Sequence, residues 1–156
     1  MHVSSDKQFI ELAGSHSVVP LVRERLADFH TPISLAARLE EDGPFFLLES
    51  VEGGETWGRY SILGFNIRRR FIIEDGQARL ESDGESQILE GNPMDVLQEF
   101  INGFDSAQIP GLPPFFGGIV GYFSFDTVRF FERCGDVKAA PERFPDAWFM
   151  ICDHLA

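Results

Sequence analysis

The segment that decides the fold is Phe45-Phe46-Leu47-Leu48-Glu49-Ser50-Val51, followed by Glu52-Gly53-Gly54-Glu55 and then by Gly58-Arg59-Tyr60-Ser61-Ile62-Leu63-Gly64. The first apolar run predicts a buried strand, the glycines predict a turn, and the second run predicts a returning strand. The turn is flanked by a carboxylate, a guanidinium and two hydroxyls beside aliphatic side chains. An amino-acid ligand needs acceptors for its ammonium, donors for its carboxylate and an apolar slot, and this segment contains all three.

Strand alternation divides these side chains between two faces. It places Leu48 and Ser50 on one face and Glu49 on the other, because successive residues of a strand point in opposite directions. If Glu49 and Ser50 contact the same ligand, either a β-bulge re-aims one of these two side chains, or one residue contributes through its side chain and the other through its backbone. Arg59 and Ser61 share a face in the same way. Without further information the segment also fits an ordinary core hairpin, since buried strands commonly end in polar residues.

Helix signals occur at four other places in the chain. Thr31-Pro32 and Asn92-Pro93 each combine an N-cap residue with proline at the first helical position. Apolar residues at helical spacing follow both pairs. The predicted helices cover residues 6–14, 32–39 and 93–101, with a short one at 126–132. Residues 16–22 are expected to be extended, and residues 21–26 fit either an extended or a helical conformation.

Strand signals fill much of the remaining sequence. Asp75-Gly76 is typical of a tight hairpin turn, and Asp83-Gly84 predicts a second one. The predicted strands cover residues 45–51, 60–66, 68–74, 77–82, 84–89, 115–125 and 146–153. Mixed helices and hairpins favour an α+β class, with mixed, largely antiparallel sheets packed as a sandwich with outer helices.

Composition narrows the class of protein. A chain of 156 residues predicts one domain or one lobe of a larger one. A formal net charge of −12 disfavours nucleic acid and anionic membranes as partners. The two cysteines, Cys134 and Cys152, make no disulfide framework, which favours a reducing, cytoplasmic setting. No apolar run approaches the ~20 residues of a membrane span, and the N-terminus lacks the pattern of a signal peptide.

Three motifs receive simple structural interpretations. Arg68-Arg69-Arg70 is interpreted as a solvated hairpin face rather than a nucleic-acid contact. Gly117-Gly118-Ile119-Val120-Gly121 matches no phosphate-binding pattern and predicts close strand packing. Cys152-Asp153-His154 lacks the paired spacing of a zinc site. No catalytic constellation is recognisable in the sequence, so we expect no catalysis from this chain and no metal or cofactor in it.

Three segments together resemble the N-terminal region of anthranilate synthase component I, a member of the chorismate-utilising enzyme family. They are residues 46–64, the run Gly117–Asp126 with Val128-Arg129-Phe130-Phe131-Glu132, and Pro145–Met150. Their order and spacing agree along nearly the whole chain. The resemblance implies one region over residues 1–156, the N-terminal lobe of the chorismate-utilising fold, with the chorismate-binding region absent.

What the resemblance implies for function is feedback regulation. The full enzyme is a lyase that converts chorismate and glutamine-derived ammonia to anthranilate and pyruvate, using magnesium and a glutamine amidotransferase component II. L-tryptophan inhibits it by binding in the N-terminal region. Carried over by motif, the expected tryptophan-binding residues are Leu48, Glu49, Ser50, Arg59, Tyr60 and Ser61. Leu48 and Ser50 share the face expected to contact the ligand, and Glu49 is expected to act through its backbone.

Two alternative functions remain at this stage. One is the corresponding lobe of aminodeoxychorismate synthase component I, and the other is a free-standing amino-acid-binding module. The apolar strand at 146–153 lies almost at the end of the sequence, which indicates a chain cut from a longer one. An exposed last strand of this kind predicts self-association into a homo-oligomer.

Overall fold

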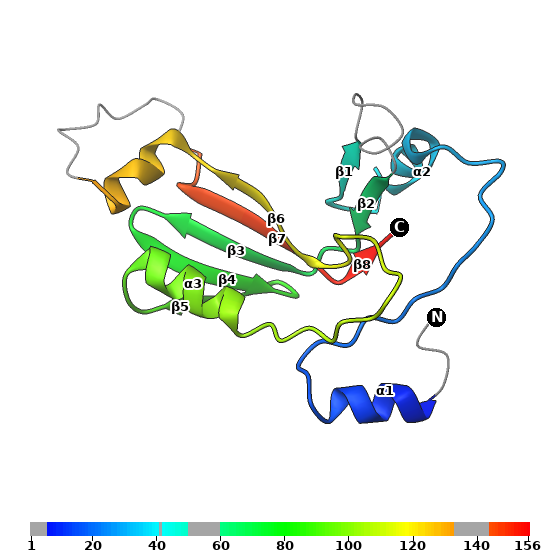
Figure 1. Ribbon diagram of the computed structural model, residues 1–156. Helices are drawn as coiled ribbons and strands as arrows, with labels where there is room; N and C mark the ends of the chain where they lie inside the picture. Colours follow the sequence, from blue (N-terminus) through cyan, green and yellow to red (C-terminus); the bar gives the residue numbers. More distant parts are fainter. Residues whose placement is uncertain (1–5, 41, 50–59, 133–143) are drawn as a thin grey trace. The chain divides into compact units, whose positions relative to one another are not determined.

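The protein divides into two compact units, each with its own sheet (Figure 1). The computed structural model describes residues 6–40, 42–49, 60–132 and 144–156. The first unit comprises Met1–Ile67, Gly103–Gly118 and Cys152–Ala156, and the second comprises Arg68–Asn102 and Ile119–Ile151. Two antiparallel sheets with few helices confirm the predicted α+β class.

The first unit is built on a three-stranded sheet in the order β1-β2-β8. Its elements are α1 (Asp6–Ala13), α2 (Pro32–Leu39), β1 (Phe46–Glu49), β2 (Ser61–Phe65) and β8 (His154–Leu155). Helix α2 begins as predicted, because the Thr31 hydroxyl accepts a hydrogen bond from the Ser34 amide and the Ser34 hydroxyl accepts one from the Thr31 amide. Residues 21–26, for which a helix was one expectation, are not helical.

An isolated parallel β-bridge between Val18 and Ser106 joins two segments of this unit that are far apart in the sequence. The Val18 amide donates to the Asp105 carbonyl over 2.9 Å, and the Ala107 amide donates to the Val18 carbonyl over 2.9 Å. The His16 imidazole lies 3.0 Å from the Asp105 carboxylate. Together these contacts fix the predicted extended segment that follows α1.

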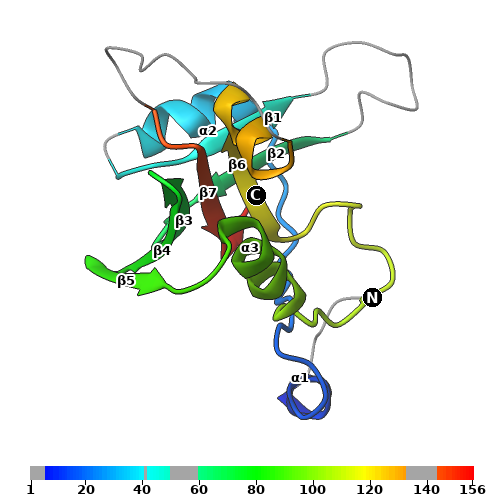
Figure 2. The same cartoon turned by 90° about the vertical axis from the view of Figure 1, so that its left-hand side faces the viewer.

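The second unit is built mostly on a five-stranded sheet in the order β5-β4-β3-β7-β6 (Figures 1 and 2). The elements are β3 (Arg69–Glu74), β4 (Gln77–Ser82), β5 (Glu85–Leu89), α3 (Pro93–Asn102), β6 (Gly118–Phe123), η2 (Phe125–Phe130) and β7 (Ala147–Cys152). Both predicted hairpin turns are present, with Asp75 and Asp83 at positive φ followed by Gly76 and Gly84, also at positive φ. The side chains of Phe71 and Phe100 pack α3 against the sheet with ring centroids 5.1 Å apart.

One expectation about the C-terminal strands was wrong. The last long strand, β7, is not exposed, because β3 and β6 flank it and nearly all of its residues are buried. It therefore cannot drive the predicted self-association. The short helix expected at 126–132 is present as a 3₁₀ helix over Phe125–Phe130. A hydrogen bond from the Thr127 hydroxyl to the Asp146 carbonyl ties that helix to the start of β7, at 2.6 Å.

Candidate functional site

The antiparallel pair β1–β2 carries the residues expected to bind an amino acid. Its register places Phe46 opposite Gly64, Leu48 opposite Ile62, and Glu49 opposite Ser61. Directly opposed residues of an antiparallel pair lie on the same face with Cβ atoms roughly 4.5–5.5 Å apart. The pair therefore brings the Glu49 and Ser61 side chains together at one end of the sheet.

The described candidates are accessible and divide between the two faces. Glu49 and Ser61 are exposed on one face, and Leu48, which is 43% exposed, lies on the other. Tyr60 is 41% exposed and immediately precedes β2. Leu48 and Glu49 thus point apart, as alternation predicts.

Ser50 and Arg59 lie outside the described residues, and their expected roles remain predictions. The preference for Leu48 and Ser50 as side-chain contacts, and for Glu49 acting through its backbone, likewise stays a prediction.

The register of this pair depends on the close approach of Phe46 and Gly64. A Cβ atom on Gly64 would lie only 2.0 Å from Cε1 of Phe46 and 2.3 Å from Cζ. The Phe46 ring therefore covers the bare backbone of Gly64, and Phe46 itself is only 8% exposed. A one-residue slip would break this contact and move Glu49 away from Ser61.

A third strand that the sequence did not indicate supports β2 from its other side. β8 pairs Leu155 with Gly64 and His154 with Phe65. Two further hydrogen bonds join the backbones of Leu63 and Ala156, at 2.8 and 2.9 Å. Because β8 covers only the Leu63–Phe65 half of β2, the half that carries Ser61 has no partner on that side among the described residues.

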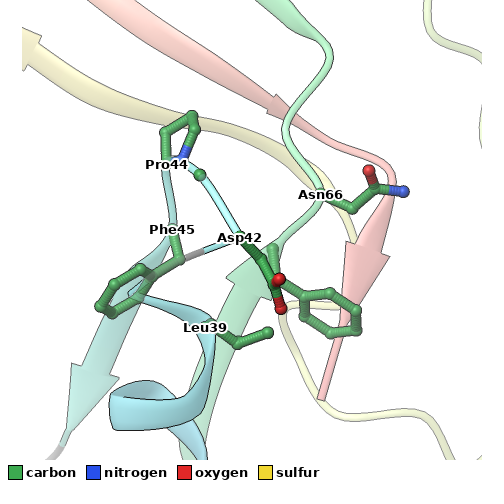
Figure 3. A pocket seen from close by; sticks show the side chains of 7 residues that line it. Leu39, Asp42, Pro44, Phe45 and Asn66 are labelled. Carbon is green, nitrogen blue, oxygen red and sulfur yellow. The ribbon is translucent and has the colours of Figure 1, made fainter.

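A separate hollow of about 350 Å³ lies where α2 passes into β1 (Figure 3). Its walls are mostly apolar, and its lining residues are Leu39, Asp42, Gly43, Pro44, Phe45, Phe65 and Asn66. Figure 3 shows the Asn66 amide directed away from Asp42, and it contacts the His154 imidazole on β8, with 3.4 Å between Nδ2 and Nδ1.

This hollow does not match the expected site. None of the lining residues is basic, so no side chain there is charged to receive the carboxylate of an amino acid. Glu49 lies four positions after Phe45, which corresponds to about 14 Å at ~3.4 Å per residue. The hollow suits a small apolar group, with Asp42 as its acidic member.

The arginine run lies on a sheet surface that carries its own acidic partners. Arg70 Nε lies 3.5 Å from a Glu81 carboxylate oxygen on the neighbouring strand. Arg79 binds Glu74 at 2.6 Å and Glu81 at 3.3 Å, and the hydrogen bond to Glu74 is the main reason that the pKa of Arg79 is raised. Arg70 and Arg79 are thus engaged by carboxylates of their own sheet.

Candidate metal clusters and membrane-spanning helices are both absent from the described part of the chain. No group of three or more histidine, cysteine, aspartate or glutamate residues gathers in a way that could hold a metal ion. None of the helices in the described part is long and apolar enough to cross a bilayer.

Comparison with known proteins gives consistent results. No protein-family model matches the chain. It is 39% identical to anthranilate synthase component 1 of Acetivibrio thermocellus, over 92% of this chain and 29% of that protein. The enzyme of Pseudomonas aeruginosa is also 39% identical, over 96% of this chain and 31% of its own length, and that of Neisseria gonorrhoeae is 36% identical, over 99% and 33%.

A solved structure agrees with the sequence matches. The crystal structure of anthranilate synthase component I from Streptococcus pneumoniae superposes with a TM-score of 0.52 at 27% identity, covering 86% of this chain and 28% of that one. The fold is therefore that of a lobe of the chorismate-utilising enzymes. More narrowly, the chain is homologous to a part of anthranilate synthase component I, which confirms the predicted resemblance. It spans about 30% of the length of these relatives.

Proposed function

We propose that this chain is the tryptophan-binding, feedback-regulatory part of anthranilate synthase component I. The observation that carries the proposal is its similarity to that enzyme over almost all of its own length, for example 39% identity over 96% of the chain. The similarity extends across the segment in which the resemblance places the inhibitor. The alternatives, an aminodeoxychorismate-type lobe and a free-standing module, have no comparable observation in their favour.

The geometry of the β1–β2 end supports this ligand class. Glu49 and Ser61 are exposed, opposed across the strand pair, and close enough to engage one polar group together. The Ser61 hydroxyl and the guanidinium of Arg59 suit a carboxylate, and Glu49 is proposed to contact the ligand through its backbone. Leu48, Ser50 and Tyr60 complete the proposed set: the side chains of Leu48 and Ser50 are the proposed direct contacts, and Leu48 and Tyr60 supply apolar and aromatic surface for an indole.

The proposed role is regulation rather than catalysis. The complete enzyme would convert chorismate and glutamine-derived ammonia to anthranilate and pyruvate, with magnesium and an amidotransferase component II. Tryptophan bound at the β1–β2 end would favour an arrangement that binds chorismate poorly. Such coupling between two sites typically amounts to about 1–3 kcal/mol, and it requires the chorismate site of the complete enzyme.

Titration calorimetry with L-tryptophan tests the proposal. We expect the 156-residue chain to bind L-tryptophan, more weakly than the complete enzyme does, and Ser50→Phe to abolish binding by filling the site. Ser86→Phe is the matched control, because it makes the same change at an exposed position of β5. Unchanged binding by Ser50→Phe, or equal losses in both variants, would refute the site assignment.

A further inference from the structure

The hollow beside α2 and β1 combines apolar walls with a single ionisable side chain, that of Asp42. Figure 3 shows the Asp42 carboxylate between Phe45 and Asn66. Among the described residues, none forms a hydrogen bond or an ion pair with this carboxylate. The hollow therefore presents an acceptor with a full negative charge that is free to engage a ligand.

One wall of the hollow is held in place by β8. The rings of Phe65 and His154 pack with their centroids 5.8 Å apart. The Asn66 amide nitrogen lies 3.4 Å from Nδ1 of the same histidine. Asn66 also has a φ of 53°, in the left-handed region that asparagine tolerates better than most residues. The amide is thus directed to β8 and leaves Asp42 as the polar side chain that faces a ligand.

The opposite wall is formed where α2 ends. The Asp42 amide donates a hydrogen bond of 3.0 Å to the carbonyl of Leu39, the last residue of α2. Gly43 then turns the chain with a φ of 122°, which a residue with a side chain rarely adopts. The C-terminal end of a helix carries a negative partial charge and attracts cations. The helix end and the Asp42 carboxylate therefore favour the same sign of charge in a ligand.

Size and lining define the class of ligand. The volume of about 350 Å³ falls within the range of small-molecule sites, roughly 300–1,000 Å³. Phe45 and Phe65 offer aromatic faces, which attract organic cations as well as hydrocarbon. An anion is repelled by Asp42 and by the formal net charge of −12. A free amino acid would bring its own carboxylate against Asp42, and no basic residue lines the hollow to receive it.

We propose that this hollow binds a small organic ammonium ion that has an aromatic or branched hydrocarbon body and no carboxylate. Asp42 accepts hydrogen bonds from the ammonium, and the apolar wall covers the hydrocarbon body. This ligand site is separate from the β1–β2 end, and it goes beyond the proposed regulatory function because it does not depend on tryptophan binding.

Backbone amide NMR of this chain, titrated with phenethylamine at pH 7, tests the proposal. The probe is an ammonium ion at this pH, because alkylamines titrate near the lysine value of about 10.4. We expect saturable shift changes that are largest at Asp42, Phe45 and Asn66, with small changes at Glu49 and Ser61. Phenethyl alcohol, which is neutral, should bind at least tenfold more weakly, and phenylacetate should not bind. The absence of saturable changes with the amine, or equal binding of the alcohol, would overturn the proposal.

A pair of matched variants assigns the selectivity to one carboxylate. Asp42→Asn keeps the shape of the side chain and should lower the affinity for phenethylamine at least tenfold, with little effect on the alcohol. Asp83→Asn removes the same charge from an exposed hairpin turn, where a φ of 49° also suits asparagine, and should change the affinity less than twofold. Equal losses in the two variants would mean that only the overall charge attracts the amine, which contradicts the proposal.

A third ligand distinguishes a small molecule from a lysine of another polypeptide. Nα-acetyl-L-lysine methylamide carries its ammonium on an unbranched chain and has no ring to fill the hollow. We expect no saturable change with this compound at the same concentrations. Binding as tight as that of phenethylamine would assign the hollow to a lysine side chain and overturn the proposal. Calorimetry with tryptophan can succeed or fail without affecting any of these results.

Discussion

Replacing Gly64 by alanine tests the register on which the candidate site depends. The new Cβ would lie 2.0 Å from the Phe46 ring, whereas an ordinary carbon contact is about 3.5–4.0 Å. The ring must therefore leave its buried position, where it is 8% exposed. Full burial of a phenylalanine contributes about 1.5–3 kcal/mol, and overpacking typically costs about 1–3 kcal/mol. We expect Gly64→Ala to lower the local free energy of unfolding by about 2–3 kcal/mol, measured by hydrogen exchange of β1 and β2 amides.

A double-mutant cycle assigns that cost to the ring. Phe46→Ala alone should cost about 3–5 kcal/mol because it leaves a cavity. In that background Gly64→Ala should cost no more than about 0.5 kcal/mol, since its methyl group enters the vacated space. Gly14→Ala is the matched control, because its Cβ would lie at least 3.4 Å from its neighbours, in ordinary contact. If Gly64→Ala costs the same with and without the Phe46 ring, the two residues do not oppose each other and the inferred register is wrong.

Three further predictions concern the second unit. Gly121→Ala should cost about 3 kcal/mol or more in thermal or urea unfolding, because its Cβ would meet a backbone carbonyl 2.0 Å away that cannot swing aside; a neutral effect would contradict the β6–β7 packing. Thr127→Val should cost about 1 kcal/mol in urea unfolding by removing a buried 2.6 Å hydrogen bond to Asp146, whereas Thr127→Ser should keep most of it. Desolvation, and then the Glu74 carboxylate, raise the pKa of Tyr122 above its ordinary value of 10.0. The folded state therefore favours the neutral phenol, and the resulting stabilisation is complete below about pH 10 and is lost as the pH rises through the folded pKa. Tyr122→Phe should reduce the alkaline loss of stability, and an unchanged pH profile would contradict the shift.

The elements predicted from sequence were those with a local chemical cause. The Thr31-Pro32 helix start and the Asp75-Gly76 turn each depend on adjacent residues, so the sequence itself identifies them. β8 could not be predicted in this way, because His154 and Leu155 form a strand only by pairing with β2, about 90 residues earlier in the chain. The burial of β7 between β3 and β6 is likewise a property of the assembled sheet.

The candidate site shows the same division between local and long-range causes. Alternation along β1 was enough to place Leu48 and Glu49 on opposite faces. The pairing of Glu49 with Ser61 depends on the register between two strands, which the Phe46–Gly64 contact sets and which alternation within one strand cannot reveal. The segment over residues 50–59 carries two of the six expected ligand contacts and lies outside the described residues.

The central claim is that L-tryptophan binds this chain at the β1–β2 end, and backbone amide NMR during a tryptophan titration tests it most directly. The account predicts saturable shift changes that are largest at Leu48, Glu49 and Ser61, with small changes at the hollow beside Phe45. L-lysine, which lacks the indole, should produce no saturable change at the same concentrations. The absence of saturable changes, or changes centred on the hollow instead, would contradict the account.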